Sequence, residues 1–394
     1  MPFLPKPYLL TNKIQRYEWG ERGPSAFIPT LLGMGGVAEN TPFAEMWMGT
    51  HPLGTSELSY GGKLVLLSDL VQRYPVEILG QRVASTFVSQ FPFLLKILSA
   101  NEPLSIQLHP SKAQAVRLHQ KDPTHYPDSN HKPEIAIALE NLRALAGLRN
   151  ARQIEALLVE HPALRDFVEY KTFSGQPKDG QPKLAFQSLL RNALAKPSEL
   201  IKVSDYLAAS LRRKDRLNYR EKLFLELNMK YAGDVGLLAI FFLKLYTLRK
   251  GQAIYIPDGV PHAYLKGNIV ECMASSDNVI RAGLTGKFKD IPALLEVVSD
   301  KPVMLYSPKT PHYVYSAPVS EFRVSKLELQ PGQNTSDKND SVRVLLIVRG
   351  RLKLTWPDGA FEARQGQSVL APASLSEMGI ECLETSEVYT AYVP

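Results

Sequence analysis

The stretch Leu104-Ser105-Ile106-Gln107-Leu108-His109-Pro110 has the alternation of a short buried strand. Side chains two residues apart on a strand point to the same face. Gln107 and His109 should therefore point together, with Ser105 beside them, away from the face that carries Ile106 and Leu108. An amide and an imidazole paired in this way can bind a metal ion. A polar-faced strand with a hydrogen-bonded histidine is the simpler explanation of this stretch taken alone.

The bulk composition is that of a globular protein, with 394 residues, 44% of them apolar and 22% charged. A chain of this length exceeds one ordinary core, so we expect two or three domains. The formal net charge of +7 permits an anionic small molecule as ligand. No basic stripe interleaved with aromatic residues indicates a nucleic-acid groove, so we expect no nucleic-acid partner.

The pattern of cysteines and apolar runs predicts a cytoplasmic protein without a membrane segment. The two cysteines, Cys272 and Cys382, do not make a disulfide framework, which favours a reducing compartment. Residues 1–11 contain no apolar run fit for a signal peptide. The most apolar stretch, residues 235–248, is interrupted by Lys244 and is too short to span a bilayer.

Residues 1–149 have the texture of short strands and turns, with frequent proline and glycine. Two apolar runs there contain one charge each, Glu45 and Lys96. A lone buried charge is costly unless it is paired, so these two residues either pair with each other or belong to a site. Further along, Lys132 precedes a proline and is biased to extended geometry. Glu134 lies on the same polar face as Lys132 in the next strand.

Residues 150–232 change to helical periodicity and predict a helical domain inserted into a β protein. Asn150 is a plausible N-cap, and further helices are expected over residues 184–194, 198–214 and 217–229. Strand texture returns over residues 233–311, where a Pro-Asp-Gly turn leads into His262.

Residues 312–394 contain an internal echo of this strand region. Gly366-Gln367, four residues and Pro372 repeat the spacing of Gly251-Gln252, four residues and Pro257. No histidine comes after Pro372, so we expect a second, diverged β-barrel unit that is structural and lacks metal ligands. The expected fold is mainly β with an α-helical insert: a first unit made of 1–149 and 233–311, the helical domain 150–232, and a C-terminal unit 312–394.

Separate strands and turns thus present Gln107 with His109, Glu134, and His262. Two histidines and a carboxylate are common ligands of a first-row divalent metal, and both types suit zinc. The glutamine adds a neutral oxygen donor. Catalytic metal sites keep one position open for water or substrate.

Several segments, in order, resemble the type I phosphomannose isomerases. The most specific are QLHP at 107–110, NHKPE at 130–134, PDGVPHAY at 257–264 and SDNVIRAGLT at 276–285; YEWG at 17–20 and AEMWMG at 44–49 are similar as well. The resemblance covers residues 10–394. It implies two cupin β-barrels with a helical domain, one zinc ion per chain, and interconversion of mannose 6-phosphate and fructose 6-phosphate through an enediol or enediolate.

The resemblance also implies roles for individual residues. Gln107, His109, Glu134 and His262 match the zinc ligands, and Arg281 matches a catalytic position. His131 and Lys132 match residues proposed for acid–base work, although either could instead support Glu134. Lys132 could move the proton if burial and a nearby cation lower its pKa. The candidates for contact with the sugar phosphate are Ser105, Lys96, Lys287, Tyr264, Trp19, Glu45 and Asp277.

Two alternatives from other classes remain open at this point. Two histidines and one carboxylate also describe the non-haem iron triad of an oxygenase, although Gln107 as a fourth ligand would fill a position that oxygen needs. A non-catalytic sugar-phosphate sensor would use the same pocket. A fused nucleotidylyltransferase is disfavoured because no Gly-rich nucleotide motif precedes the isomerase-like part. We expect a monomer whose partner is a small sugar phosphate.

Overall fold

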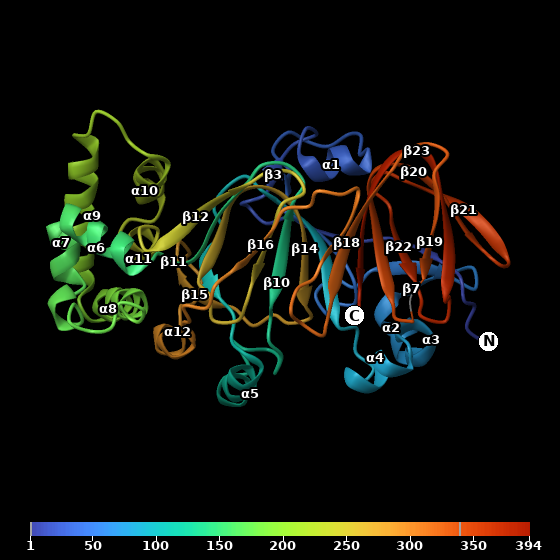
Figure 1. Cartoon of the computed structure of the whole chain (residues 1–394), viewed down its shortest axis with the longest axis horizontal. Coiled ribbons are helices and arrows are strands. Elements are labelled where there is room, and N and C mark those ends of the chain that lie inside the picture. The colour runs from blue at the N-terminus through green and yellow to red at the C-terminus, as the bar shows by residue number, and fades with distance from the viewer. Residues whose placement is uncertain (1, 339) are drawn as a thin grey trace.

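The computed structural model describes residues 2–338 and 340–394. Three parts lie one after another along the long axis of the molecule (Figure 1): a block of helices at one end, a β unit in the middle and a second β unit at the other end. No helix in the described part of the chain combines the length and the apolar composition needed to cross a membrane. The mainly β fold with a helical insert is confirmed.

The central part, which we call the catalytic β unit, is an antiparallel system of eleven strands. Its longest strand, β14, pairs with β9 and β11 near its start and with β8 and β10 further on. The strands are β2 (Lys13–Gln15), β5 (Glu45–Met48), β8 (Phe93–Ala100), β9 (Ile106–Leu108), β10 (Glu134–Ala138), β11 (Leu142–Leu148), β12 (Leu243–Leu248), β13 (Ala253–Ile256), β14 (His262–Ala274), β15 (Ile280–Gly283) and β16 (Met304–Tyr306).

Gly267 marks the point where β14 passes from one set of partners to the other. Lys266 is opposite Arg143 of β11, whereas Gly267 is opposite Ala100 of β8. Gly267 has φ +135°, and a Cβ there would lie 2.5 Å from the Asn141 carbonyl oxygen. Only glycine fits such a close approach without strain. The corner lets one strand contribute to both sheets of the unit, as cupin-like folds require.

Short helices and hairpins surround the catalytic β unit, and several were not predicted. Residues 67–86 form three short helices where the sequence suggested strands and turns; pieces this short carry too few turns for a helical period to show. Helix α5 starts at a capping box between Ser111 and Gln114. These elements are β3 (Glu21–Arg22), α1 (Phe27–Leu32), β4 (Pro42–Phe43), β6 (Glu57–Tyr60), β7 (Lys63–Leu66), α2 (Leu67–Arg73), α3 (Pro75–Leu79), α4 (Gln81–Thr86), α5 (Lys112–Lys121) and α12 (Ile291–Val297).

The helical insert lies between β11 and β12, the two strands that pair at its base. Asn150 caps its first helix with Gln153 as reciprocal partner, as the sequence predicts. The insert continues past residue 232 into one more short helix. Its elements are α6 (Ala151–Glu160), α7 (Pro162–Phe167), η1 (Tyr170–Thr172), α8 (Gln181–Ala195), α9 (Pro197–Arg212), α10 (Tyr219–Lys230) and α11 (Val235–Ala239). Phe186 and Phe224 of the insert share a core with Leu265 and Ile280 of the catalytic β unit.

The C-terminal β unit is an antiparallel sheet in which the expected echo is visible as strand β22, two residues after Gly366. One strand comes from elsewhere: Tyr8 to Leu10 pair with Leu370 to Ser368, so the N-terminal strand belongs to this sheet and not to the catalytic unit. The strands are β1 (Tyr8–Leu10), β17 (His312–Tyr315), β18 (Arg323–Leu329), β19 (Asn334–Lys338), β20 (Arg343–Trp356), β21 (Gly359–Arg364), β22 (Ser368–Ala371) and β23 (Glu377–Tyr392).

Candidate active site

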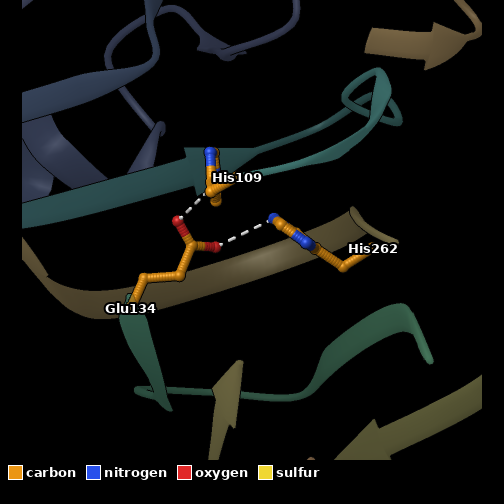
Figure 2. Close-up of side chains that lie close together, drawn as sticks. All are labelled: His109, Glu134 and His262. Carbon is orange, nitrogen blue, oxygen red and sulfur yellow. Dashed lines mark ion pairs between the residues drawn. The ribbon is translucent and has the colours of Figure 1, made fainter. Parts of the chain in front are cut away.

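Three buried side chains from separate strands meet in the catalytic β unit (Figure 2). His109 comes directly after β9, Glu134 opens β10 and His262 opens β14. The Glu134 Oε2 atom lies 3.3 Å from His109 Nε2, and its Oε1 atom lies 3.1 Å from His262 Nε2. One ligand atom from each residue lies within 4.8 Å of the others, which is the spacing of a metal-binding cluster.

Both histidine rings are oriented by backbone carbonyls behind them. His109 Nδ1 lies 2.8 Å from the Asn278 oxygen, and His262 Nδ1 lies 2.9 Å from the Val260 oxygen. A carbonyl only accepts, so in the neutral ring Nδ1 carries the proton and Nε2 directs a lone pair toward Glu134. Both Nε2 atoms are buried without a hydrogen-bond partner. Buried nitrogens in this tautomer, facing a carboxylate, fit a metal ion.

Burial and charge act on the protonation of the cluster in opposite directions. Burial lowers the pKa of His109 to about 4, so its ring is neutral at pH 7. Burial would raise the pKa of Glu134, but the two histidines outweigh it and hold that pKa well below its usual range. Tyr264 donates a hydrogen bond from its hydroxyl to Glu134 Oε1 at 2.8 Å. The carboxylate is therefore ionised and held in place.

Gln107 lies next to the histidines as its alternation with His109 predicted. Its backbone is directly opposite His262 in the pairing of β9 with β14. Ser105 donates a hydrogen bond to the Gln107 amide oxygen at 3.4 Å, which is long. Both side chains line a cavity of about 460 Å³ that reaches Glu134. The same-face prediction for the opening stretch is thus confirmed.

This active-site cavity contains nearly every residue proposed from the sequence for catalysis or substrate contact. Trp19, Lys96 and Tyr264 line it together with Arg281 and Lys287. The remaining proposed residues along its wall are Glu45, Ser105, Lys132 and Asp277. The cavity size is typical of small-molecule sites.

A buried charged group forms one wall of the active-site cavity. Lys96 Nζ lies 3.5 Å from Glu45 Oε2 and 3.2 Å from Glu271 Oε2. The two charges flagged in the sequence are therefore both paired and part of the site. Burial raises the pKa of Glu271 to about 7, against the lowering effect of Lys96. Glu271 was missed as a site residue because it is one charge in an apolar strand, with no spacing signal toward Lys96.

Lys132 meets the condition set for a proton carrier. Burial, and next the charge of Lys96, lower its pKa below the ordinary value. Its neighbour His131 lies elsewhere: His131 Nε2 is 2.6 Å from Glu321 Oε1, a residue that leads into the C-terminal β unit. His131 is not among the residues that line the active-site cavity. The adjacent residues of an extended chain point to opposite sides, which separates the two.

Basic residues gather at the mouth of the active-site cavity. Arg281 of β15 lies opposite Gln107 of β9 in the sheet, and burial lowers the pKa of its guanidinium. Lys230 and Tyr231, at the end of α10, also line the cavity. Both were missed in the sequence because nothing in a helical stripe indicates which helix end will reach a distant strand.

Asp277 is held on the cavity wall by a buried histidine. The Nε2 atom of His51 lies 3.0 Å from Asp277 Oδ1. This contact, with the charge of His51, lowers the pKa of Asp277 against the effect of burial. His51 was missed as well, because it lies in a turn with no spacing relation to Asp277.

A cupin-like unit with a buried His–Glu–His cluster at the base of a polar cavity defines a cupin metalloenzyme class. Residues 8–151 match the family described as phosphomannose isomerase type I, catalytic domain. The mannose-6-phosphate isomerase of Homo sapiens is 36% identical over 384 residues, covering 90% of both chains. That of Schizosaccharomyces pombe is 35% identical over 373 residues, covering 87% of this chain and 89% of the relative.

Solved structures give the same result. Mannose 6-phosphate isomerase from Salmonella typhimurium, solved with fructose 6-phosphate and zinc, superimposes with a TM-score of 0.84 at 30% identity, covering 98% of this chain and 99% of that one. The chain belongs to the type I phosphomannose isomerase family and is an isomerase.

Proposed function

We propose that this isomerase interconverts mannose 6-phosphate and fructose 6-phosphate with one zinc ion bound by Gln107, His109, Glu134 and His262. The observation that supports it most is the cluster of two oriented histidines and one ionised carboxylate at the base of the active-site cavity. Bound zinc would act as a Lewis acid toward the substrate oxygens as negative charge develops there. The relative from Salmonella typhimurium is described with fructose 6-phosphate and zinc.

The reaction needs a proton taken from the carbon next to the sugar carbonyl and returned to the neighbouring carbon. Lys132 is our candidate for the residue that moves it between C2 and C1, through an enediol or enediolate. Its lowered pKa increases the share of neutral amine that can accept a proton near neutral pH. Lys96, with its pKa raised by Glu45 and Glu271 against the effect of burial, keeps its charge and repels a proton on Lys132.

Binding of the phosphate group is assigned in this proposal to the cavity mouth. Arg281 offers a planar fork of donors that suits phosphate or an enediolate. Lys287 is exposed on the same rim, 5.9 Å from the centre of the Tyr17 ring. Trp19 and Tyr264 supply a flat wall and a hydroxyl for the sugar itself. His131 has no part in the proposal because it faces Glu321.

A coupled isomerase assay on mannose 6-phosphate tests the proposal directly. Turnover is expected with the purified chain, loss after chelation, and recovery when zinc is added back. Iron content together with oxygen consumption would favour the oxygenase alternative and overturn the isomerase assignment. Sugar-phosphate binding without turnover in fully zinc-loaded protein would favour the sensor alternative.

A further inference from the structure

A second cavity lies where the helical insert meets the catalytic β unit, away from the active-site cavity. We call it the basic cavity; it has a volume of about 440 Å³. It is lined by Arg149, Gln153, Asn218, Tyr219, Arg220, Lys244, Leu245 and Tyr246. None of these residues lines the active-site cavity. The basic cavity is therefore a separate feature with its own chemistry.

The lining of the basic cavity contains three cations and no carboxylate. Arg149 donates from Nη1 to the Phe241 carbonyl oxygen at 3.0 Å, and Arg220 donates from Nη2 to the Leu243 oxygen at 2.7 Å. These backbone contacts fix both guanidinium groups and leave other donors unused. Among the described residues, no carboxylate lies within ion-pair distance of Arg149, Arg220 or Lys244, and the Nε atom of Arg220 is buried without a partner.

The carboxylates near the arginines already have another partner. Glu160 and Glu221 line a smaller adjoining space of about 120 Å³ behind Arg149 and Arg220. Both bind Lys214, at 2.6 Å and 2.7 Å. Burial, and next the charge of Arg149, lower the pKa of Arg220 to about 10. Two half-buried guanidinium groups thus repel each other, a cost that a bound anion would remove.

A helix end adds to the positive potential of the basic cavity. Asn218 is the N-cap of α10, a helix of 12 residues, and Tyr219 and Arg220 are its first two helical residues. Backbone N–H groups and the helix dipole at such an end favour an anion. Tyr219 and Tyr246 line the cavity beside the cations. Cations next to aromatic rings suit a phosphate attached to a larger flat group.

We propose that the basic cavity is a second anion site of this protein, which binds a phosphate-bearing small molecule between Arg149, Arg220 and Lys244. The phosphate oxygens accept hydrogen bonds from the unused guanidinium donors, with Lys244 as a point charge opposite. The cavity volume lies within the range of small-molecule sites. Lys244 is on β12, which pairs with β11, and β11 pairs with the His262 end of β14.

The test measures pyrophosphate binding by isothermal titration at low ionic strength. The starting protein is the full zinc-loaded chain with Arg281→Gln and Lys287→Gln, which removes the cations of the active-site mouth. We expect one pyrophosphate bound per chain. Adding Lys244→Gln should weaken this binding about tenfold, because one charge-assisted contact is lost. Lys222→Gln, an exposed lysine of the same helix as Arg220 that does not line the cavity, is the matched control and should change nothing.

Further arms identify the ligand chemistry and guard against unfolding. Inorganic phosphate should bind more weakly than pyrophosphate, and a hexose phosphate or a nucleotide that binds more tightly would identify the attached group. Thermal unfolding of each variant checks the fold; Lys244→Gln removes no described ion pair. The proposal is overturned if the starting protein binds no pyrophosphate, or if Lys244→Gln and Lys222→Gln bind it equally well. Neither result depends on isomerase activity, so it leaves the proposed function untouched.

Discussion

In the catalytic β unit Gly251 has φ +81° and precedes β13; in the C-terminal β unit Gly366 has φ +82° and precedes β22. Each strand starts two residues after its glycine and ends directly before a proline. The backbone is therefore repeated in detail at these two places. The chain diverges beyond the two prolines: Pro257 leads to His262 at the metal cluster, whereas Pro372 leads to an apolar turn at Leu375.

The interiors of the two units differ in side-chain size. The apolar interior of the catalytic unit includes Ala100, Ala136, Ala138, Ala144 and Ala146. The C-terminal unit is packed instead with larger aliphatic residues such as Leu345, Ile347, Leu352, Leu354 and Ile380. Small residues leave room beside the strands, and large ones fill it. An open, polar cavity is thus made by removing side-chain volume as well as by adding ligands.

The largest effect is expected for Glu134→Gln in the catalytic unit. The amide keeps the shape of the side chain but removes the charge between His109 and His262, so zinc should be lost and kcat should fall on the order of 10³-fold. Metal content and the coupled assay measure this. Glu387→Gln is the matched change of a buried glutamate in the C-terminal unit, where the side chain binds Lys250 at 2.6 Å. Its kcat should stay within about twofold of wild type, since it touches no reacting group.

Lys132→Arg is expected to come next, with kcat reduced about 10²–10⁴-fold because a guanidinium does not release its proton. Zinc should remain bound. The pKa of Lys132 is lowered from 10.5, and the neutral amine is the active form. In wild type, kcat/KM should therefore rise with pH, with a midpoint below 10.5, and this limb should be absent in the variant.

Lys326→Arg in the C-terminal unit is the control for that change, because Lys326 is buried and paired with Glu328 and Glu387. It should leave the pH profile as it is. Near-normal turnover of Lys132→Arg with zinc bound would remove Lys132 from the mechanism.

Leu354→Ala should reduce stability rather than activity. It creates a space in the filled interior of the C-terminal unit, with an expected cost of about 2–5 kcal/mol. Ala136→Leu does the opposite in the catalytic unit: Ala136 is opposite Glu271 in the sheet, so a larger side chain would crowd the active-site cavity. Chemical denaturation and kcat, measured on both variants, separate the two outcomes. Equal losses of activity would contradict the division of labour between the units.

His131→Gln should have the smallest effect, since it removes a partly exposed contact with Glu321 between the two units. We expect a loss of stability of about 1 kcal/mol or less and nearly normal turnover. Denaturation midpoints and the coupled assay measure both. A large fall in kcat at unchanged stability would restore His131 as a catalytic candidate.

The metal cluster could be predicted because its residues lie in local patterns: the alternation of Gln107 with His109 and the turn before His262. Glu271 could not, since its role depends on Lys96, a partner on another strand. The same applies to β1, whose pairing with β22 joins opposite ends of the chain and has no local signature. His131 was misplaced because a motif match gives adjacent residues a common role, whereas an extended backbone sends their side chains apart.

The insertion point of the helical block has a consequence for how this architecture can diversify. The chain leaves the sheet after Leu148 and returns at Leu243, and these two residues are paired neighbours on β11 and β12. A tight hairpin could close the same gap, so residues 149–242 form an exchangeable module with adjacent attachment points. The module nevertheless supplies Lys230 and Tyr231 to the rim of the active-site cavity. Replacing it would change which sugars are admitted while leaving the metal ligands on an intact scaffold.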